Sequence, residues 1–138
     1  MIYKFRILSS ENADFLRDIE INSEQTFLDF HNAIQQSVGY DNSQLASFFL
    51  TNEKWEKERE ITLMEMEQDD DYSKIVMDVS PISEFIKDEK QKLLYVFDFF
   101  AERAFFIKLI EIKNASTNIK YPVCTNIVGN APSQLLAK

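Results

Sequence analysis

The sequence predicts a single α+β domain, with a largely antiparallel or mixed sheet, one main helix after an N-terminal hairpin, and a second short helix. Segments with alternating apolar side chains, typical of half-buried strands, flank one segment with helical spacing. The expected strands come in neighbouring pairs rather than in regular strand–helix–strand units, which favours antiparallel pairing. A length of 138 residues suits one domain.

The first expected element is the hairpin. Residues 2–8 alternate between apolar and polar side chains, and residues 15–21 do the same. Arg17 is an exception, because it shares the face of its strand that is otherwise apolar. The polar residues 9–14 supply a turn between the two strands.

Residues 27–38 change to helical spacing, and this segment is the predicted main helix. Ser23 or Thr26 can cap its N-terminus, and Gly39 suits the position after its last turn. One face of the helix carries the apolar side chains together with the only histidine of the chain: Phe27, Phe30, His31, Ile34 and Val38.

The middle of the chain is expected to add two strands and the short helix. Residues 44–52 and 60–66 have strand-like patterns with a charged connection between them. Residues 80–90 are the predicted short helix, because Ser80 can cap it and Pro81 suits a first turn.

The last third of the chain holds the two most β-prone segments, residues 91–100 and 103–113. They are close enough to form a tight hairpin, and their apolar side chains on both faces indicate central strands. Residues 119–138 have no clear period and are expected to form an irregular tail. Because no linker or repeat divides the chain, residues 1–138 are expected to form one domain.

Composition and charge restrict the class of protein. The net charge of −8 disfavours a nucleic-acid partner, because such binding depends on Lys and Arg neutralising phosphates. No apolar stretch approaches the ~20 residues that cross a bilayer, and the N-terminus lacks a signal-peptide pattern. Cys124 is the only cysteine, which fits a reducing compartment. We therefore expect a cytoplasmic protein without a membrane partner.

His31 is the first candidate for a functional residue. A histidine can act as a base or bind a metal, but the helix offers it no second metal-ligating side chain at the required spacing. Gln35 follows one turn later, so the alternative is a hydrogen-bonded pair that joins the helix to the sheet. A catalytic pair of His31 and Cys124 is disfavoured, and the thiol is expected to be buried or unreactive.

Asp98 and Glu102 are the second candidates, because paired carboxylates can perform acid–base chemistry. Asp98 lies in an apolar strand, where an unpaired charge is costly, so a structural ion pair with Arg103 or Arg6 is the competing explanation. Both roles of Asp98, in acid–base chemistry and in a structural ion pair, remain open alternatives.

The candidate ligand- or partner-binding residues are Gln35, Tyr40, Trp55 and Tyr121. Trp55 lies among charged residues and can either fold back onto the core or anchor a partner. No cofactor is expected, because the chain contains no phosphate-binding glycine loop. No metal site is expected either, since the consecutive aspartates 69–71 lack the spacing and glycine of a calcium-binding loop.

Four stretches occur in an order that resembles the Ri-plasmid ORF-three-like family, whose members are also labelled transposon-element passenger proteins of TnpR type. The stretches are "FLDFHNAIQQSVGYDNSQLASFFL", "WEKEREITL", "LLYVFDFFAERAFFIKLIEI" and "YPVCTNIVGNAPSQ". The most specific matches are the helix pattern of His31, Ile34, Gln35 and Gly39, and the Tyr-x-Phe-Asp-Phe strand at residues 95–99. The resemblance implies a compact α+β domain of uncharacterised function, carried on plasmids and mobile elements.

The chain departs from this family at two places. Phe100, Ala101 and Glu102 replace a typical Gly-Asp, and "NAPSQ" lacks an acidic pair. These losses imply a weakened acidic site. The resolvase-like label is unsupported, because a serine recombinase needs a catalytic serine, several arginines and a basic DNA-binding part.

The sequence therefore predicts a non-enzymatic binding or protein-interaction domain associated with plasmids or mobile elements. Its partner is expected to be an unknown protein or a small ligand. The alternative is a small-ligand-binding or hydrolytic site around His31, Asp98 and Glu102, to which Gln35 and Tyr121 could contribute.

Overall fold

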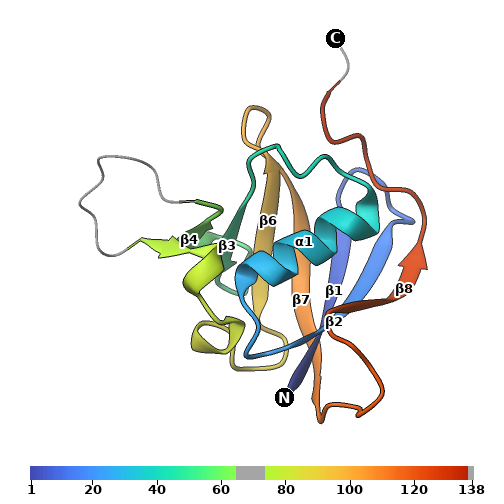
Figure 1. Ribbon diagram of the computed structural model, residues 1–138. Coiled ribbons are helices and arrows are strands. Elements are labelled where there is room, and N and C mark those ends of the chain that lie inside the picture. The colour runs from blue at the N-terminus through green and yellow to red at the C-terminus, as the bar shows by residue number, and fades with distance from the viewer. Residues whose placement is uncertain (65–73, 137–138) are drawn as a thin grey trace.

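Residues 1–64 and 74–136 are described by this computed structural model, and they form an eight-stranded sheet with an α-helix packed against it (Figure 1). The elements in chain order are β1 (Ile2–Ser9), β2 (Leu16–Asn22), α1 (Phe27–Val38), β3 (Ser47–Thr51), β4 (Lys57–Thr62), β5 (Ile75–Val76), the 3-10 turns η1 (Met77–Val79) and η2 (Ile82–Glu84), β6 (Lys92–Asp98), β7 (Arg103–Lys113) and β8 (Val123–Val128).

The sheet is mixed, with strand order β5-β4-β3-β6-β7-β1-β2-β8. The β4–β5 pair is parallel and the other neighbouring pairs are antiparallel. The predicted α+β class, the N-terminal β1–β2 hairpin and the central β6–β7 hairpin are therefore confirmed. The short loops between β1 and β2 and between β6 and β7 explain why local sequence signals were sufficient there.

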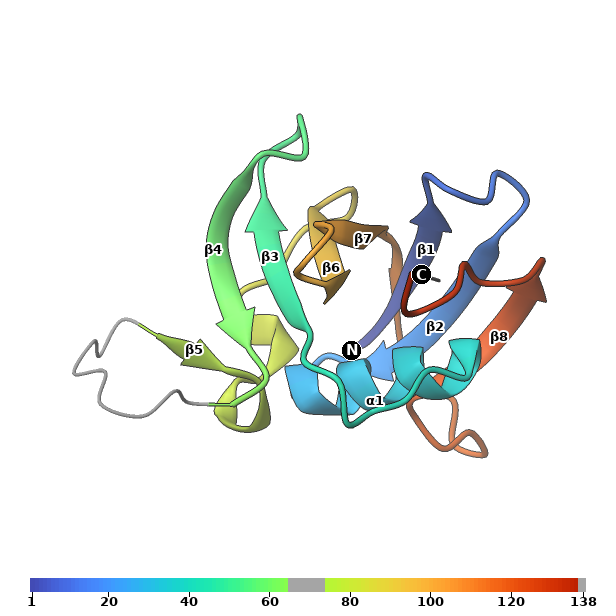
Figure 2. The same cartoon turned by 90° about the horizontal axis from the view of Figure 1, so that it is seen from above.

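The sheet is strongly curved, and both of its ends bend towards the side on which α1 packs (Figure 2). The core lies between the helix and this concave face. Phe30 of α1 stacks on Phe5 at 4.6 Å between ring centroids and on Phe48 at 5.2 Å. All three rings are fully buried, and each contributes about 1.5–3 kcal/mol to stability through burial.

The main helix begins and ends where the sequence predicts. Thr26 accepts a hydrogen bond from the backbone N–H of Asp29, and the Asp29 carboxylate accepts one from the backbone N–H of Thr26. This reciprocal capping box satisfies two helix N–H groups that have no partner within the helix. Gly39 adopts the left-handed conformation, with φ of 69°, and ends the helix.

Replacing Thr26 with alanine is expected to lower the free energy of unfolding by about 1 kcal/mol, because the Asp29 N–H loses its acceptor. Urea denaturation measures this difference, and Thr26→Ser is the matched control because serine keeps the capping oxygen. A Thr26→Ser variant as unstable as Thr26→Ala would contradict the capping explanation.

The second helix is shorter than the predicted range of residues 80–90 and consists of the 3-10 turn η2. Ser80 does not cap it, since the Ser80 hydroxyl donates to the Val76 carbonyl at 2.7 Å. The chain around Pro81 is extended and forms a β-bridge to Thr26. Backbone pairing with the segment before α1 therefore replaces the helical hydrogen bonds.

The prediction of an irregular tail over residues 119–138 is wrong for its central part. Residues Val123–Val128 form β8, which pairs antiparallel with β2 and extends the sheet. The charged connection after β3 is also shorter than expected, because β4 already begins at Lys57. The end of the predicted strand 60–66 and the aspartates 69–71 lie outside the described residues.

Candidate functional site

His31 and Gln35 meet at one hydroxyl group in the core. The Tyr95 hydroxyl lies 2.7 Å from His31 Nδ1, and Gln35 Nε2 donates to the same oxygen at 2.6 Å. His31 is only 2% exposed. The predicted direct bond between His31 and Gln35 is replaced by this shared contact, which joins α1 to the centre of the sheet.

Burial lowers the pKa of His31 to about 4, so its imidazole is neutral at physiological pH. The Tyr95 hydroxyl can then donate to Nδ1 while it accepts from Gln35. Burial also raises the pKa of Tyr95. The Gln35 Oε1 atom is buried without a hydrogen-bond partner among the described residues. The arrangement stabilises the core and gives His31 no access to a substrate from solvent.

Acidification should destabilise the protein through His31. Its pKa of about 4 in the folded state lies below the 6.5 of the unfolded chain, so the unfolded state binds more protons between these values. The free energy of unfolding should therefore fall by about 2 kcal/mol between pH 7 and pH 5 from this group alone.

Urea denaturation at pH 7, 6 and 5 measures this loss, with His31→Gln as the reference because glutamine does not titrate. We expect the variant to lose about 2 kcal/mol less stability than the wild type between pH 7 and pH 5. Parallel pH profiles of the two proteins would show that His31 does not titrate as its burial requires.

Asp98 forms an ion pair with Arg103, one of the two cations that the sequence offered. Its carboxylate accepts from Arg103 Nη1 at 3.3 Å and from the backbone N–H of Ala101 at 3.1 Å. Arg6, the other predicted cation, instead binds Asp18 through two hydrogen bonds. Glu102 is exposed in the β6–β7 turn, with a positive φ of 55°.

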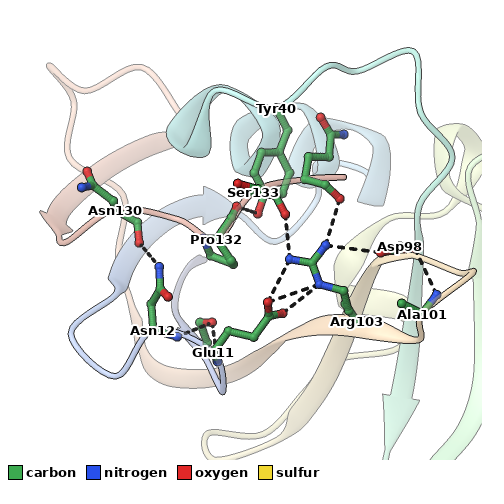
Figure 3. Close-up of polar contacts among 11 residues, drawn as sticks. Glu11, Asn12, Tyr40, Asp98, Ala101, Arg103, Asn130, Pro132 and Ser133 are labelled. Carbon is green, nitrogen blue, oxygen red and sulfur yellow. Dashed lines mark hydrogen bonds and ion pairs between the residues drawn. The ribbon is translucent and has the colours of Figure 1, made fainter. Parts of the chain in front are cut away.

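Arg103 is the centre of a larger polar cluster at the end of the sheet (Figure 3). Its guanidinium also binds Glu11 at 2.9 Å and the backbone carbonyls of Ser133 and Gln134 at 2.7 and 3.1 Å. The side chain is 9% exposed and lies 4.9 Å from the Phe97 ring centroid. Hydrogen bonding to Glu11 is the main cause that raises the pKa of Arg103.

The three catalytic candidates are not brought together. His31 and Asp98 share no hydrogen bond, and no described residue binds both of them. The carboxylate of Asp98 is occupied by Arg103, while Glu102 is directed to the surface. No hydrogen bond or ion pair between described residues joins any two of these three candidates.

The aromatic candidates also have structural partners. Tyr40 donates to the Pro132 carbonyl and packs on Phe97 at 5.3 Å. Trp55 folds back onto the sheet, where its edge meets Phe106 at 5.1 Å. The Tyr121 hydroxyl accepts a hydrogen bond from the backbone N–H of Ser116, and Tyr121 also lines a groove.

That groove lies between α1 and β8 and encloses about 530 Å³. Three residues of one helix face form one wall: Asn32, Ala33 and Gln36. Three residues of β8 form much of the other wall: Val123, Cys124 and Ile127. Burial raises the pKa of the Cys124 thiol, which favours the unreactive role predicted for it. The groove combines apolar surface with two exposed amide side chains.

β8 is also the last strand of the sheet, so its outer edge pairs with no strand in the described part of the chain. Its six residues contain no charge and no proline, and Ile127 is 63% exposed. Proteins ordinarily protect a free edge with charges, proline or extreme shortness. β5, at the other end of the sheet, has only two residues, whereas the six-residue β8 has no charge and no proline. A bulge near Thr125 is the one edge-protecting feature of β8.

The sequence did not indicate this groove because residues 119–138, which include β8, were expected to be irregular. Within residues 1–64 and 74–136, no three His, Cys, Asp or Glu side chains gather as a metal site requires. The helices of that part of the chain are too short or too polar to cross a membrane.

Comparison with known proteins places the chain in a family. A search of curated proteins found no match. A solved structure titled as a protein of unknown function, MM3350 from Methanosarcina mazei Go1, has a TM-score of 0.74 and 22% identity, covering 91% of this chain and 68% of that chain. This similarity shows the fold alone. The family model for the plasmid pRiA4b ORF-3-like protein matches residues 1–134, and the chain therefore belongs to that family.

Proposed function

We propose that this chain is a non-enzymatic binding domain that takes an extended segment of a partner protein as an added strand on β8. The observation that carries the proposal is the open, uncharged edge of β8 beside the groove against α1. The unpaired N–H and C=O groups of such an edge are satisfied best by another extended backbone.

The groove supplies the second requirement for recognising a peptide strand. Alternate side chains of an added strand point to the same face, so they would enter the space between β8 and α1. Cys124 and Ile127 offer apolar contact there, while Asn32 and Gln36 offer amide donors and acceptors. Main-chain hydrogen bonds would provide affinity, and these side chains would provide specificity.

The environments of the catalytic candidates favour binding over hydrolysis. His31 is buried, and Asp98 is occupied by Arg103, so neither offers a free acid or base. The net charge of −8 favours a protein partner over a nucleic acid. The association with plasmids rests on the family name.

A displayed library of random peptides, selected on the immobilised full chain, tests the proposal. Enriched peptides should bind the wild type and lose affinity by about tenfold or more with Ile127→Lys, since a lost contact worth about 1.4 kcal/mol suffices. Val79→Lys is the matched control, because Val79 is a similarly exposed aliphatic residue outside the groove.

Two results would overturn this function. Enriched peptides could bind Ile127→Lys and the wild type equally well, which would place their site elsewhere. Alternatively, the chain could form dimers that Ile127→Lys disrupts in sedimentation velocity, in which case the occupant of the β8 edge is a second copy of the chain.

A further inference from the structure

The face of the sheet opposite α1 carries a second set of apolar side chains. Leu94 and Val96 of β6 point away from the core, since the residues that alternate with them, Leu93, Tyr95 and Phe97, belong to it. In Figure 2, α1 and the two 3-10 turns lie on the concave side of the sheet, so no described helix covers this outer face. An uncovered sheet face is ordinarily polar, and these apolar side chains therefore need an explanation.

A groove of about 480 Å³, here called the outer groove, runs over this face. Its floor comes from two paired strands and is apolar: Leu94, Val96, Ala104 and Phe106. Lys57 of β4 lines one side, and Ser10 and Glu11 of the β1–β2 hairpin line the other. In Figure 2, the β3–β4 and β1–β2 hairpins extend on either side of β6 and β7. The outer groove shares no lining residue with the groove between α1 and β8.

Trp55, the only tryptophan of the chain, lies beside the floor of the outer groove. Its ring meets the Phe106 ring at 5.1 Å between centroids, and Lys92 Nζ lies 4.9 Å from its centroid. The ring is half-buried, so part of it stays accessible. Trp55 has a left-handed φ of 66° in the β3–β4 turn, a conformation that suits glycine or asparagine and is uncommon for a bulky residue. Strained backbone of this kind is concentrated at binding sites.

Three lysines surround the apolar floor: Lys57, Lys92 and Lys108. Lys57 Nζ lies 4.5 Å from the Phe49 ring centroid, on the same face. Lys92 and Lys108 lie directly opposite each other, one residue pair further along β6 and β7 than the floor. Like charges in such a position are destabilising. In the part of the chain that the structure describes, none of the three lysines forms an ion pair.

The carboxylates around the outer groove leave these lysines unpaired. Glu11 binds Arg103 at 2.9 Å, and Glu60 of β4 accepts a hydrogen bond from a β3 hydroxyl at 2.8 Å. Glu102 lies six residues before Lys108, or about 20 Å of extended chain. The lysines extend from β4 to β7, which is three strand spacings or about 15 Å. They form a small cationic patch in a chain whose net charge is −8.

We infer that the outer groove binds an acidic segment of a partner protein that also carries an apolar side chain. The apolar side chain would occupy the floor beside Trp55, and the carboxylates would lie against the three lysines. A nucleic acid or a membrane is larger than the patch and would also face the acidic surroundings, whose repulsion a short segment avoids. The inference does not depend on a strand added to β8, because the two grooves are separate.

Subtractive selection from a displayed library of random peptides tests the inference. Peptides that bind the double variant Lys92→Glu/Lys108→Glu are removed first, and the remainder is selected on the wild-type chain. Peptides that bind the β8 edge are lost in the first step, because the double variant keeps that edge. The peptides that the wild type then retains should contain Asp or Glu beside an aromatic or aliphatic residue.

The fluorescence of Trp55 reports where the selected peptide binds. The tightest peptide, synthesised without tryptophan, should change this fluorescence, and its affinity should fall as salt is added. Lys108→Glu should weaken binding by about tenfold, since an attraction becomes a repulsion. Lys87→Glu is the matched control, with the same change in net charge at an exposed residue outside the outer groove, and should change affinity by less than about twofold.

The inference would be overturned if the selection enriched no peptide or only peptides without a carboxylate. Unchanged Trp55 fluorescence on binding, or equal weakening by Lys108→Glu and Lys87→Glu, would also overturn it. If oligodeoxythymidine, or vesicles of phosphatidylcholine and phosphatidylserine, changed Trp55 fluorescence in a Lys108-dependent way while no peptide did, the occupant would be a nucleic acid or a membrane. None of these results affects the proposed function, which depends on the loss of binding in Ile127→Lys.

Discussion

Replacing Arg103 with methionine is expected to lower the free energy of unfolding by about 3 kcal/mol, because removing one partner of a buried ion pair leaves the other charge uncompensated. Asp98 would lose its cation while its side chain remains 11% exposed. The Ser133 and Gln134 carbonyls would lose a donor as well, and the segment after β8 would lose its attachment to β7. Chemical denaturation measures the difference.

Glu11→Gln is the matched control for this prediction. Glu11 contacts the same guanidinium, but its side chain is 37% exposed, so water can replace much of the interaction. We expect a loss of about 1 kcal/mol or less for this variant. If Arg103→Met and Glu11→Gln cost the same, the cluster in Figure 3 is not organised by a buried Arg103.

Replacing Tyr95 with phenylalanine is expected to cost about 2–4 kcal/mol, because two buried polar groups lose their shared partner and each costs about 1–3 kcal/mol when unsatisfied. His31 Nδ1 and Gln35 Nε2 both depend on this hydroxyl. Phenylalanine keeps the ring packing, so the change isolates the hydrogen bonds. Thermal and urea denaturation at pH 7 provide the measurement.

Tyr3→Phe is the reference for that substitution, since the Tyr3 hydroxyl makes a single buried bond to the Ile86 carbonyl at 2.8 Å. It should cost about 1 kcal/mol, the usual net value of one hydrogen bond. Equal losses in Tyr95→Phe and Tyr3→Phe would mean that the shared hydroxyl does not couple α1 to the sheet.

Local signals explain why the main helix was predicted correctly. The capping residue Thr26, the spacing of the apolar side chains and the terminal Gly39 all lie within or directly beside residues 27–38. Each acts over one or two helical turns, so no knowledge of the rest of the fold is needed. The tight β6–β7 hairpin was predictable for the same reason.

β8 could not be predicted because its pairing is not local. It pairs with β2, which lies about a hundred residues earlier in the chain, and four of its six residues are exposed. An exposed edge strand lacks the apolar alternation that identifies a half-buried strand. The residues after β8 are likewise held by side chains from distant elements, such as Tyr40 and Arg103.

The candidate site was predictable in part. The sequence offered a link between helix and sheet through His31 and Gln35 as one of two alternatives, but their shared partner Tyr95 is 64 residues from His31. The ion pair of Asp98 and Arg103 was predictable because the two residues flank one turn. Arg17 carried a usable signal, since a cation on the apolar face of a strand must find buried partners.

Amide hydrogen exchange of the full chain, with and without the tightest library peptide, tests the central claim most directly. An added strand should slow the exchange of amides in β8, whose outward N–H groups would become hydrogen-bonded, and of residues around the groove wall of α1. Protection confined to segments other than β8 and α1, with unchanged exchange in residues 123–128, would contradict a peptide strand on this edge.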